Sequence, residues 1–93
     1  ETQIVRSLVP EAAGRLVEEA VAFVQRLRKD DLDKVPGVAE TLDWVRALHR
    51  MKLTALPDDP HGLMATLGCL LKTREDRFQL GPERVLQLIE GRR

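Results

Sequence analysis

The sequence predicts an all-α fold, a compact bundle of about four helices, and three observations support this. Apolar residues recur at helical spacing within segments that proline and glycine bound. No segment keeps the strict alternation of a half-buried strand. Apolar residues make up 43% of the 93 residues but only Phe23, Trp44 and Phe78 are aromatic, so the core must be built mainly from leucine, valine and alanine. This length suits a single domain, residues 1–93.

The first two segments meet at a proline. Residues 1–9 are interpreted as the tail of a preceding element, stopped by Pro10 because the residue before a proline is pushed towards an extended conformation. The first full helix is expected from Pro10 to about Lys29, with Pro10 and Glu11 in its first turn. Its buried face has the spacing i, i+4, i+7, i+8 and i+11 and comprises Leu16, Ala20, Phe23, Val24 and Leu27.

A turn over residues 30–36 follows, and we expect Leu32 and Val35 to pack back against the core. The second helix is predicted from Val38 to about Lys52. At 100° per residue its apolar stripe comprises Val38, Leu42, Val45 and Leu48, with Trp44 and Met51 along one margin.

Two more helices complete the predicted bundle. Asp59 is the expected N-cap and Pro60 the first residue of a third helix that runs to about Arg77. A fourth helix begins at Pro82 and stops at Gly91. The third helix should bury Leu63, Met64, Leu67, Leu70 and Leu71, and the fourth Val85, Leu88 and Ile89.

Charge and composition argue against several classes of partner. Fifteen acidic and fifteen basic residues cancel, and no block of five or six like charges occurs, so neither nucleic acid nor a membrane surface is an expected partner. No apolar run approaches the length of a membrane span. The single cysteine excludes an internal disulfide and fits a reducing compartment, so a cytoplasmic location is expected.

Residues that could bind a metal or act as a nucleophile lack the required spacing. His49 and His61 are twelve residues apart, Cys69 follows eight later, and no CxxC, HxxxH or HExxH pattern occurs, so no metal site is predicted. We expect His49 to be partly buried and hydrogen-bonded, His61 to be solvated and Cys69 to serve packing in mid-helix. Gly68 beside it would mark a close approach of two helices.

Carboxylates and phosphate-binding patterns give no catalytic residue either. The pairs at 18–19, 30–31 and 58–59 are typical of solvated faces and turns. The run KTREDR, residues 72–77, suits ion pairs on an exposed helix end. The sharper alternative is an interaction surface formed by Lys72, Arg74, Glu75 and Asp76. Neither GxxxxGK[ST] nor GxGxxG occurs, so the chain alone is not expected to be an enzyme.

Two blocks nevertheless resemble a known family. KVPGVAETLDWVRAL (34–48) and TLGCLLKTREDR (66–77) resemble the carboxyl-terminal lid of bacterial MoxR-type AAA+ ATPases, in the branch associated with carbon monoxide dehydrogenase maturation. The resemblance covers essentially the whole chain and is strongest from Arg28 to Arg77. It implies an AAA+ lid-like helical bundle.

The resemblance also implies a larger machine. Such lids follow an α/β domain with a P-loop, so ATP and Mg²⁺ would be cofactors of the full-length ATP-hydrolysing enzyme and none is expected in this chain. Implied partners are its own P-loop domain, neighbouring subunits of a ring and a von Willebrand factor A domain protein, in chaperone-like maturation of a metalloenzyme. The chain begins at Glu1 rather than at a methionine, which agrees with a part of a longer protein.

The sequence departs from many AAA+ lids at one functional position. An arginine there, the sensor 2 residue, reaches the γ-phosphate of the nucleotide. Here the comparable position is Glu40 or Thr41, which are therefore the nucleotide-facing residues by resemblance, and no arginine follows in this helix until Arg46. A carboxylate repels a triphosphate unless a cation lies between them. Glu40 would instead cap the helix or face an arginine of the motor domain or of the next subunit.

A second reading of the whole chain comes from a different class. It is a free-standing helical adaptor that presents a groove or a charged face to a protein partner. A methionine codon within a few residues of Glu1 would favour this adaptor over the lid.

Overall fold

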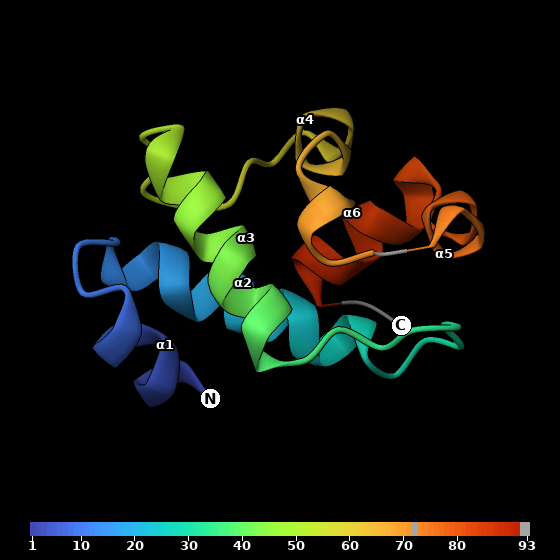
Figure 1. Ribbon diagram of the computed structural model, residues 1–93. Helices are drawn as coiled ribbons and strands as arrows, with labels where there is room; N and C mark the ends of the chain where they lie inside the picture. Colours follow the sequence, from blue (N-terminus) through green and yellow to red (C-terminus); the bar gives the residue numbers. More distant parts are fainter. Residues whose placement is uncertain (72, 92–93) are drawn as a thin grey trace.

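The computed structural model describes residues 1–71 and 73–91, and over these two stretches it contains helices and no strand, so the predicted all-α fold is confirmed (Figure 1). The helices are more numerous and shorter than expected. In chain order they are α1 (Thr2–Leu8), α2 (Gly14–Leu27), α3 (Val38–Arg50), α4 (Pro60–Met64), the short 3₁₀ helix η1 (Leu67–Cys69), α5 (Arg74–Gln79) and α6 (Pro82–Glu90).

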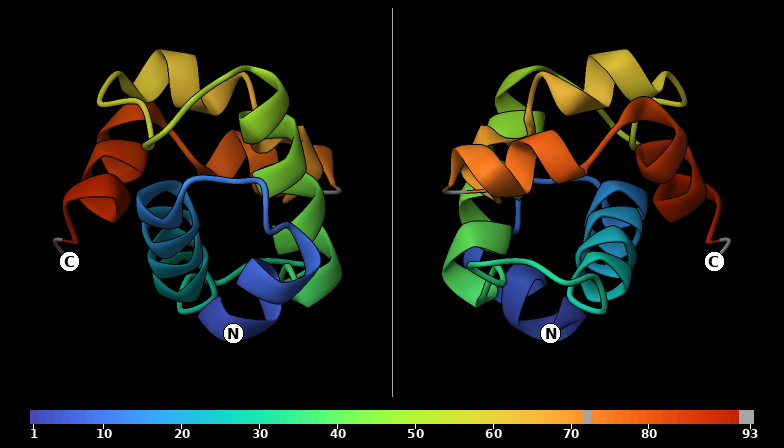
Figure 2. Two further views of the ribbon diagram at one scale, coloured as in Figure 1. Left: turned by 90° about the vertical axis from the view of Figure 1, so that its left-hand side faces the viewer. Right: turned by 90° about the vertical axis from the view of Figure 1, so that its right-hand side faces the viewer.

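The molecule is built around α2, which packs against α1, α3 and α6. α1 and α4 lie at opposite ends of the molecule (Figure 2). The helices enclose one continuous apolar core, and the molecule measures 32 × 24 × 22 Å. Within the described residues no helix is long and apolar enough to cross a membrane.

The first helix of the predicted bundle starts later than expected. Pro10 and Glu11 do not form its first turn, because the chain reverses direction there and the Val9 carbonyl accepts a hydrogen bond from the Ala12 N–H at 3.2 Å. α2 therefore begins at Gly14. Its inward face is as predicted, with Leu16, Ala20, Phe23, Val24 and Leu27 all buried.

Residues 1–9, expected to be the tail of a preceding element, form a helix that packs on α2 and α3. Val5 and Val9 are fully buried in the core. In the loop that follows α2, Leu32 is buried as predicted, whereas the expectation for Val35 was wrong, since 52% of it is exposed.

α3 has nearly the predicted bounds but a rotated buried face. Trp44, placed by the sequence at the margin of the stripe, lies at its centre and packs against Phe23 with ring centroids 5.2 Å apart. Val38, which the predicted stripe included, is exposed, and so is Met51, which was placed at its margin. The rotation follows from the bulk of Trp44, because burying an indole removes more apolar surface from water than burying a valine. The buried residues of α3 are Thr41, Trp44, Val45 and Leu48.

The single helix predicted over residues 60–77 was wrong, since the chain forms α4, η1 and α5 there. The Thr66 hydroxyl donates to the Leu63 carbonyl at 2.7 Å, an interaction that competes with helical pairing, and Gly68 is a poor helix former. Thr73 then caps a new helix. The inward leucines keep their expected places, with Leu63, Leu67, Leu70 and Leu71 buried and Met64 half-buried against them.

α6 begins and ends as predicted. Pro82 is its first residue and Gly91 ends it at φ 78°, in the left-handed region that favours glycine. Arg26 of α2 reaches this end and donates from Nη1 to the Leu88 carbonyl at 2.8 Å. A cation at the carboxyl end of a helix also suits the helix dipole. Val85 and Leu88 are buried and Ile89 is half-buried, so the expected inward face is confirmed.

Candidate functional site

The start of α3 is the place where Glu40 and Thr41 were expected to face a nucleotide. Glu40 Oε1 accepts a hydrogen bond from the Gly37 N–H at 2.9 Å, so this side chain caps the helix, one of the two alternatives predicted for it. Thr41 is fully buried and its Oγ1 lies 3.0 Å from the Gly37 carbonyl oxygen. Of the two residues, only Glu40 is partly accessible from outside.

An arginine does reach this entrance, from α2 rather than from α3. Arg28 donates from Nη1 and Nη2 to the two carboxylate oxygens of Glu1, each at 2.6 Å, and from Nε to the Pro36 carbonyl at 2.8 Å. Its Nη2 also lies 3.5 Å from the Thr41 hydroxyl. Arg28 therefore joins α1, α2 and the loop that leads into α3. Sequence reasoning missed it because the partners are 8 to 27 residues away and no local pattern marks such contacts.

The electrostatics of this cluster keep both partners charged. The hydrogen bonds and charge of Arg28 lower the pKa of the Glu1 carboxyl, although burial alone would raise it. The same hydrogen bonds raise the pKa of Arg28 against the opposing effect of burial, and the nearby Glu40 carboxylate adds to the rise. The bidentate geometry is the strongest form of such a pair.

Trp44 connects the two sequence blocks directly. Its Nε1–H donates to the Thr66 hydroxyl at 2.9 Å, which in turn donates to the Leu63 carbonyl. The indole is fully buried, so this hydrogen bond satisfies a polar group that burial would otherwise leave unpaired. The tryptophan of the first block is thus fixed by the first threonine of the second.

A second link between the blocks runs through Asp76, whose side chain is 0% exposed. Its carboxylate accepts hydrogen bonds from the N–H groups of Asp33 at 2.8 Å and Lys34 at 3.0 Å. Burial raises the pKa of this carboxyl, but the backbone N–H groups of Lys34 and Asp33 and the Thr73 hydroxyl outweigh it, so the pKa is lowered. Asp76 holds the loop before α3 in place.

The predicted interaction surface therefore needs a correction. Asp76 is inside the protein and does not contribute to it, because the carboxylate is used by the loop at 33–34. Lys72 lies outside the described residues. Arg74 and Glu75 are exposed as expected. The sequence did not single out Phe78, which is 80% exposed on the same helix, because a lone aromatic residue reads as core.

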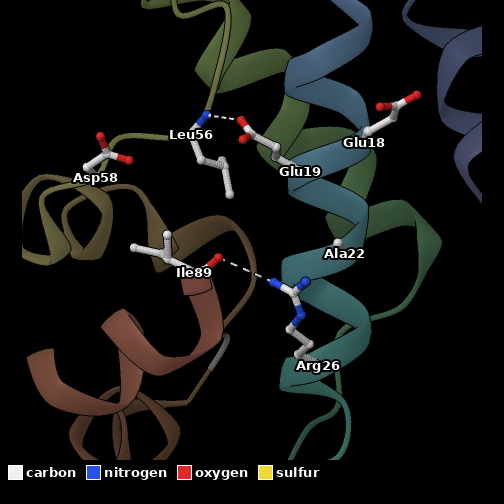
Figure 3. A pocket seen from close by; sticks show the side chains of 7 residues that line it. All are labelled: Glu18, Glu19, Ala22, Arg26, Leu56, Asp58 and Ile89. Carbon is white, nitrogen blue, oxygen red and sulfur yellow. Dashed lines mark hydrogen bonds between the residues drawn. The ribbon is translucent and has the colours of Figure 1, made fainter. Parts of the chain in front are cut away.

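A pocket of about 240 Å³ lies between α2, the loop before α4 and the end of α6 (Figure 3). Three of its charged side chains already have partners: Glu18 pairs with Arg6, Glu19 accepts from the Leu56 N–H at 2.9 Å, and Arg26 binds the end of α6. These contacts connect α2 to α1, to the loop before α4 and to α6. They leave no pair of these side chains free to bind a substrate. It is lined by Glu18, Glu19, Ala22, Arg26, Leu56, Asp58 and Ile89.

The candidate ligands and nucleophile stay apart. Across residues 1–71 and 73–91 no three His, Cys, Asp or Glu side chains form a group that could hold a metal ion. His49 is half-buried and His61 exposed. Cys69 is half-buried at the end of η1 rather than in mid-helix. The close helix approach expected at Gly68 was wrong, since this glycine is exposed and an added Cβ would meet no atom nearer than Arg77 Nη2, at 3.9 Å.

No family model, curated protein or solved structure matches this chain. The likeness to MoxR-type lids accordingly rests on the residues of its two blocks. In the structure the two blocks are in direct contact, because buried hydrogen bonds of Trp44 and Asp76 connect them.

Proposed function

We propose that this chain is the helical lid of a MoxR-type AAA+ ATPase, coupling nucleotide state to ring geometry in the chaperone-like maturation of a metalloenzyme. The observation that carries the proposal is the pairing of the two blocks. Trp44 of the first binds Thr66 of the second, and Asp76 of the second holds the backbone that begins the first. Residues that carry the resemblance are thus the ones that fix the fold, as expected when a likeness reflects a shared architecture.

In this role the lid acts as a rigid body. Buried polar links hold the loop before α3 from two sides, because Asp76 binds the N–H groups at 33–34 and Arg28 binds the Pro36 carbonyl. ATP and Mg²⁺ would be held by the P-loop domain. This chain would supply no catalytic residue and would act through its position in the ring. Glu40 serves as a helix cap, so direct sensing of the γ-phosphate is not assigned to it. Its own P-loop domain, neighbouring subunits and a von Willebrand factor A domain protein would be its partners in the cytoplasm.

Binding and turnover of ATP test the proposal. We expect residues 1–93 alone to give no heat with Mg·ATP in a calorimetric titration, and the chain extended upstream to bind and hydrolyse it. Removing residues 1–93 from the extended protein should reduce turnover and ring assembly together. Binding of ATP by residues 1–93 alone, or an upstream sequence without a P-loop, would contradict the lid.

The adaptor remains a second candidate because of one observation, the 80% exposure of Phe78 beside Arg74 and Glu75 on α5. Aromatic residues are enriched in protein–protein interfaces relative to the rest of the surface. A methionine codon close to Glu1 and the absence of any P-loop upstream would favour the adaptor. A P-loop there would favour the lid, with Phe78 as a contact inside the ring.

A further inference from the structure

A larger pocket lies where the end of α3 and the turn after it meet the loop between α1 and α2, on one side of the molecule (Figure 1). Its volume is about 510 Å³, within the usual range for ligand pockets. Ala13 and Leu53 give it an apolar lining, and both pack against the core from outside. The other side chains that line it are charged or polar and include Glu11, His49, Arg50 and Lys52.

We propose that this pocket binds an acidic segment of a partner protein. One apolar side chain of that segment would lie against Ala13 and Leu53, and its carboxylates would pair with Arg50 and Lys52. An apolar centre surrounded by polar groups is the usual arrangement of a protein–protein contact. The pocket is at the opposite end of α3 from the cap formed by Glu40, and the inference does not rest on the chain being a lid.

The basic side chains of the pocket are not used inside the protein. Among the described residues, Arg50 and Lys52 form no ion pair and no side-chain hydrogen bond. By contrast, three arginines elsewhere bind a carbonyl or a carboxylate of the chain: Arg26, Arg28 and Arg84. Glu11 is the one carboxylate that lines the pocket, and it pairs with neither cation. The free charge of the pocket is therefore positive and complements an acidic ligand.

Lys52 adds an independent observation. Its φ is 63°, the one positive φ at a residue other than glycine in the described part of the chain. Its N–H donates to the His49 carbonyl at 2.8 Å, and the Leu53 N–H donates to the Leu48 carbonyl at 3.2 Å. A helix end with these two hydrogen bonds ordinarily has glycine at the position of Lys52.

The helix dipole does not explain this lysine. A cation near the carboxyl end of a helix is favourable, but Arg50 already supplies one in the last turn of α3. Lysine at position 52 also holds the backbone in a conformation that glycine adopts without strain. A side chain that strains the backbone and contacts nothing within the protein indicates a use in binding.

A protein segment is favoured over nucleic acid for two reasons. The chain as a whole has a formal net charge of zero, so it exerts no general attraction on a polyanion. Half-buried Ala13 and Leu53 offer nothing to a phosphate backbone, whereas they fit the side chain of a leucine or a similar residue.

The test is a titration of isotope-labelled residues 1–93 with a blocked synthetic peptide in which one leucine is flanked on each side by two glutamates. Backbone amide NMR signals of residues 11–13 and 49–54 should shift. Arg50→Gln should weaken binding by about threefold or more, as for the loss of one ion pair. Arg74→Gln, which removes the same charge from the exposed face of α5, is the matched control and should leave the affinity unchanged.

Lys52→Gly separates binding from folding. We expect it to raise the melting temperature, because glycine relaxes the positive φ, and to weaken peptide binding by about threefold or more. The dispersion of the amide signals reports that the variant is folded. An affinity equal to that of Arg74→Gln would overturn the inference, whatever the melting temperature.

Variants of the peptide test the chemistry of the ligand. Serine in place of the leucine, or lysines in place of the glutamates, should each abolish the shifts at residues 49–54. Equal binding of the serine peptide, or full displacement of the leucine peptide by tripolyphosphate at constant ionic strength, would show a site for anions alone and overturn the proposal. Absence of shifts with the leucine peptide would do the same. No nucleotide or P-loop domain takes part, so these outcomes are independent of whether the chain is a lid.

Discussion

At the scale of single residues, Trp44 is the largest fully buried side chain of the described residues and also makes a specific hydrogen bond. It packs against Phe23 and donates to Thr66, so it ties α2, α3 and the segment before η1 together. We expect Trp44→Ala to lower the free energy of unfolding by about 3–5 kcal/mol, the range for large aromatic truncations in cores. Trp44→Phe, which keeps a ring and loses the donor, should cost less. Urea denaturation measures both, and a loss below about 1 kcal/mol for the alanine variant would contradict its central place in the core.

The lowered pKa of Asp76 predicts how the stability of the protein depends on pH. Its pKa in the folded protein is lower than its ordinary value of 3.8, so the ionised carboxylate stabilises the fold above that value, and this contribution is lost as the pH falls through the folded pKa. Asp76→Asn should therefore be less stable than the unsubstituted protein at pH 7, and the difference should shrink towards zero in strong acid. Urea titrations from pH 7 to pH 2 follow this difference. Glu75→Gln, an exposed neighbour, should show no comparable dependence, and a constant difference for Asp76→Asn would refute the prediction.

The residues that could be predicted from sequence are those whose partners are close along the chain. Asp59 accepts from the N–H groups of His61 and Gly62, and Gly91 ends its own helix, so local rules identified both. Arg28 and Asp76 have partners 27 and 43 residues away. Their roles depend on how the helices pack, which no short pattern contains, and Asp76 was consequently assigned to the surface.

At the scale of elements, the segment 60–77 shows why helix boundaries were the weakest part of the prediction. The apolar spacing was sound, since the expected leucines are buried, but spacing does not show whether a helix is continuous. The hydroxyl of Thr66 bonds back to the Leu63 carbonyl and the exposed Gly68 follows two residues later. The apolar pattern predicted one continuous helix, but the polar Thr66 and the flexible Gly68 interrupt it.

Two glycines provide a test at this scale with opposite outcomes. Gly68 is exposed and has room for a Cβ, so Gly68→Ala should stabilise the protein by about 0.4–1 kcal/mol through the unfolded chain. Gly91 has φ 78° and an added Cβ would lie 3.1 Å from the Arg26 guanidinium, so Gly91→Ala should destabilise by about 1–2 kcal/mol. Thermal unfolding of the two variants side by side measures the contrast. Equal shifts of the same sign would contradict the open surroundings of Gly68 and the assigned end of α6.

At the scale of the whole molecule, the fold class followed from composition and periodicity, because leucine- and valine-rich helical spacing permits little else in 93 residues. The arrangement of the helices did not follow from them. Residues 1–9 were interpreted as the tail of a preceding element, and the sequence pattern did not show that Val5 and Val9 enter the core or that Glu1 binds Arg28. Such docking adds long-range contacts that a one-dimensional pattern does not encode.

The exposed Phe78 gives a prediction for the complete assembly. Phe78→Ser should change the stability of residues 1–93 by no more than about 0.5 kcal/mol, because 80% of the side chain is already in water. In the upstream-extended protein, the same substitution should weaken assembly, which analytical ultracentrifugation measures. Glu83→Ser, an exposed position on α6, is the control. Unchanged assembly would show that α5 faces solvent in the complete protein as well.

The loop before α3 is fixed by hydrogen bonds from both Asp76 and Arg28, and this has a mechanical consequence. Phe78 is two residues from Asp76, Asp76 holds the backbone of Lys34, and Arg28 holds Pro36 two residues further on. A partner that moves α5 would therefore act on the same short stretch of backbone that Arg28, at the end of α2, holds from the other side. A force applied to the outside of the molecule at α5 would therefore reach α2, the helix around which the core is built, through one loop.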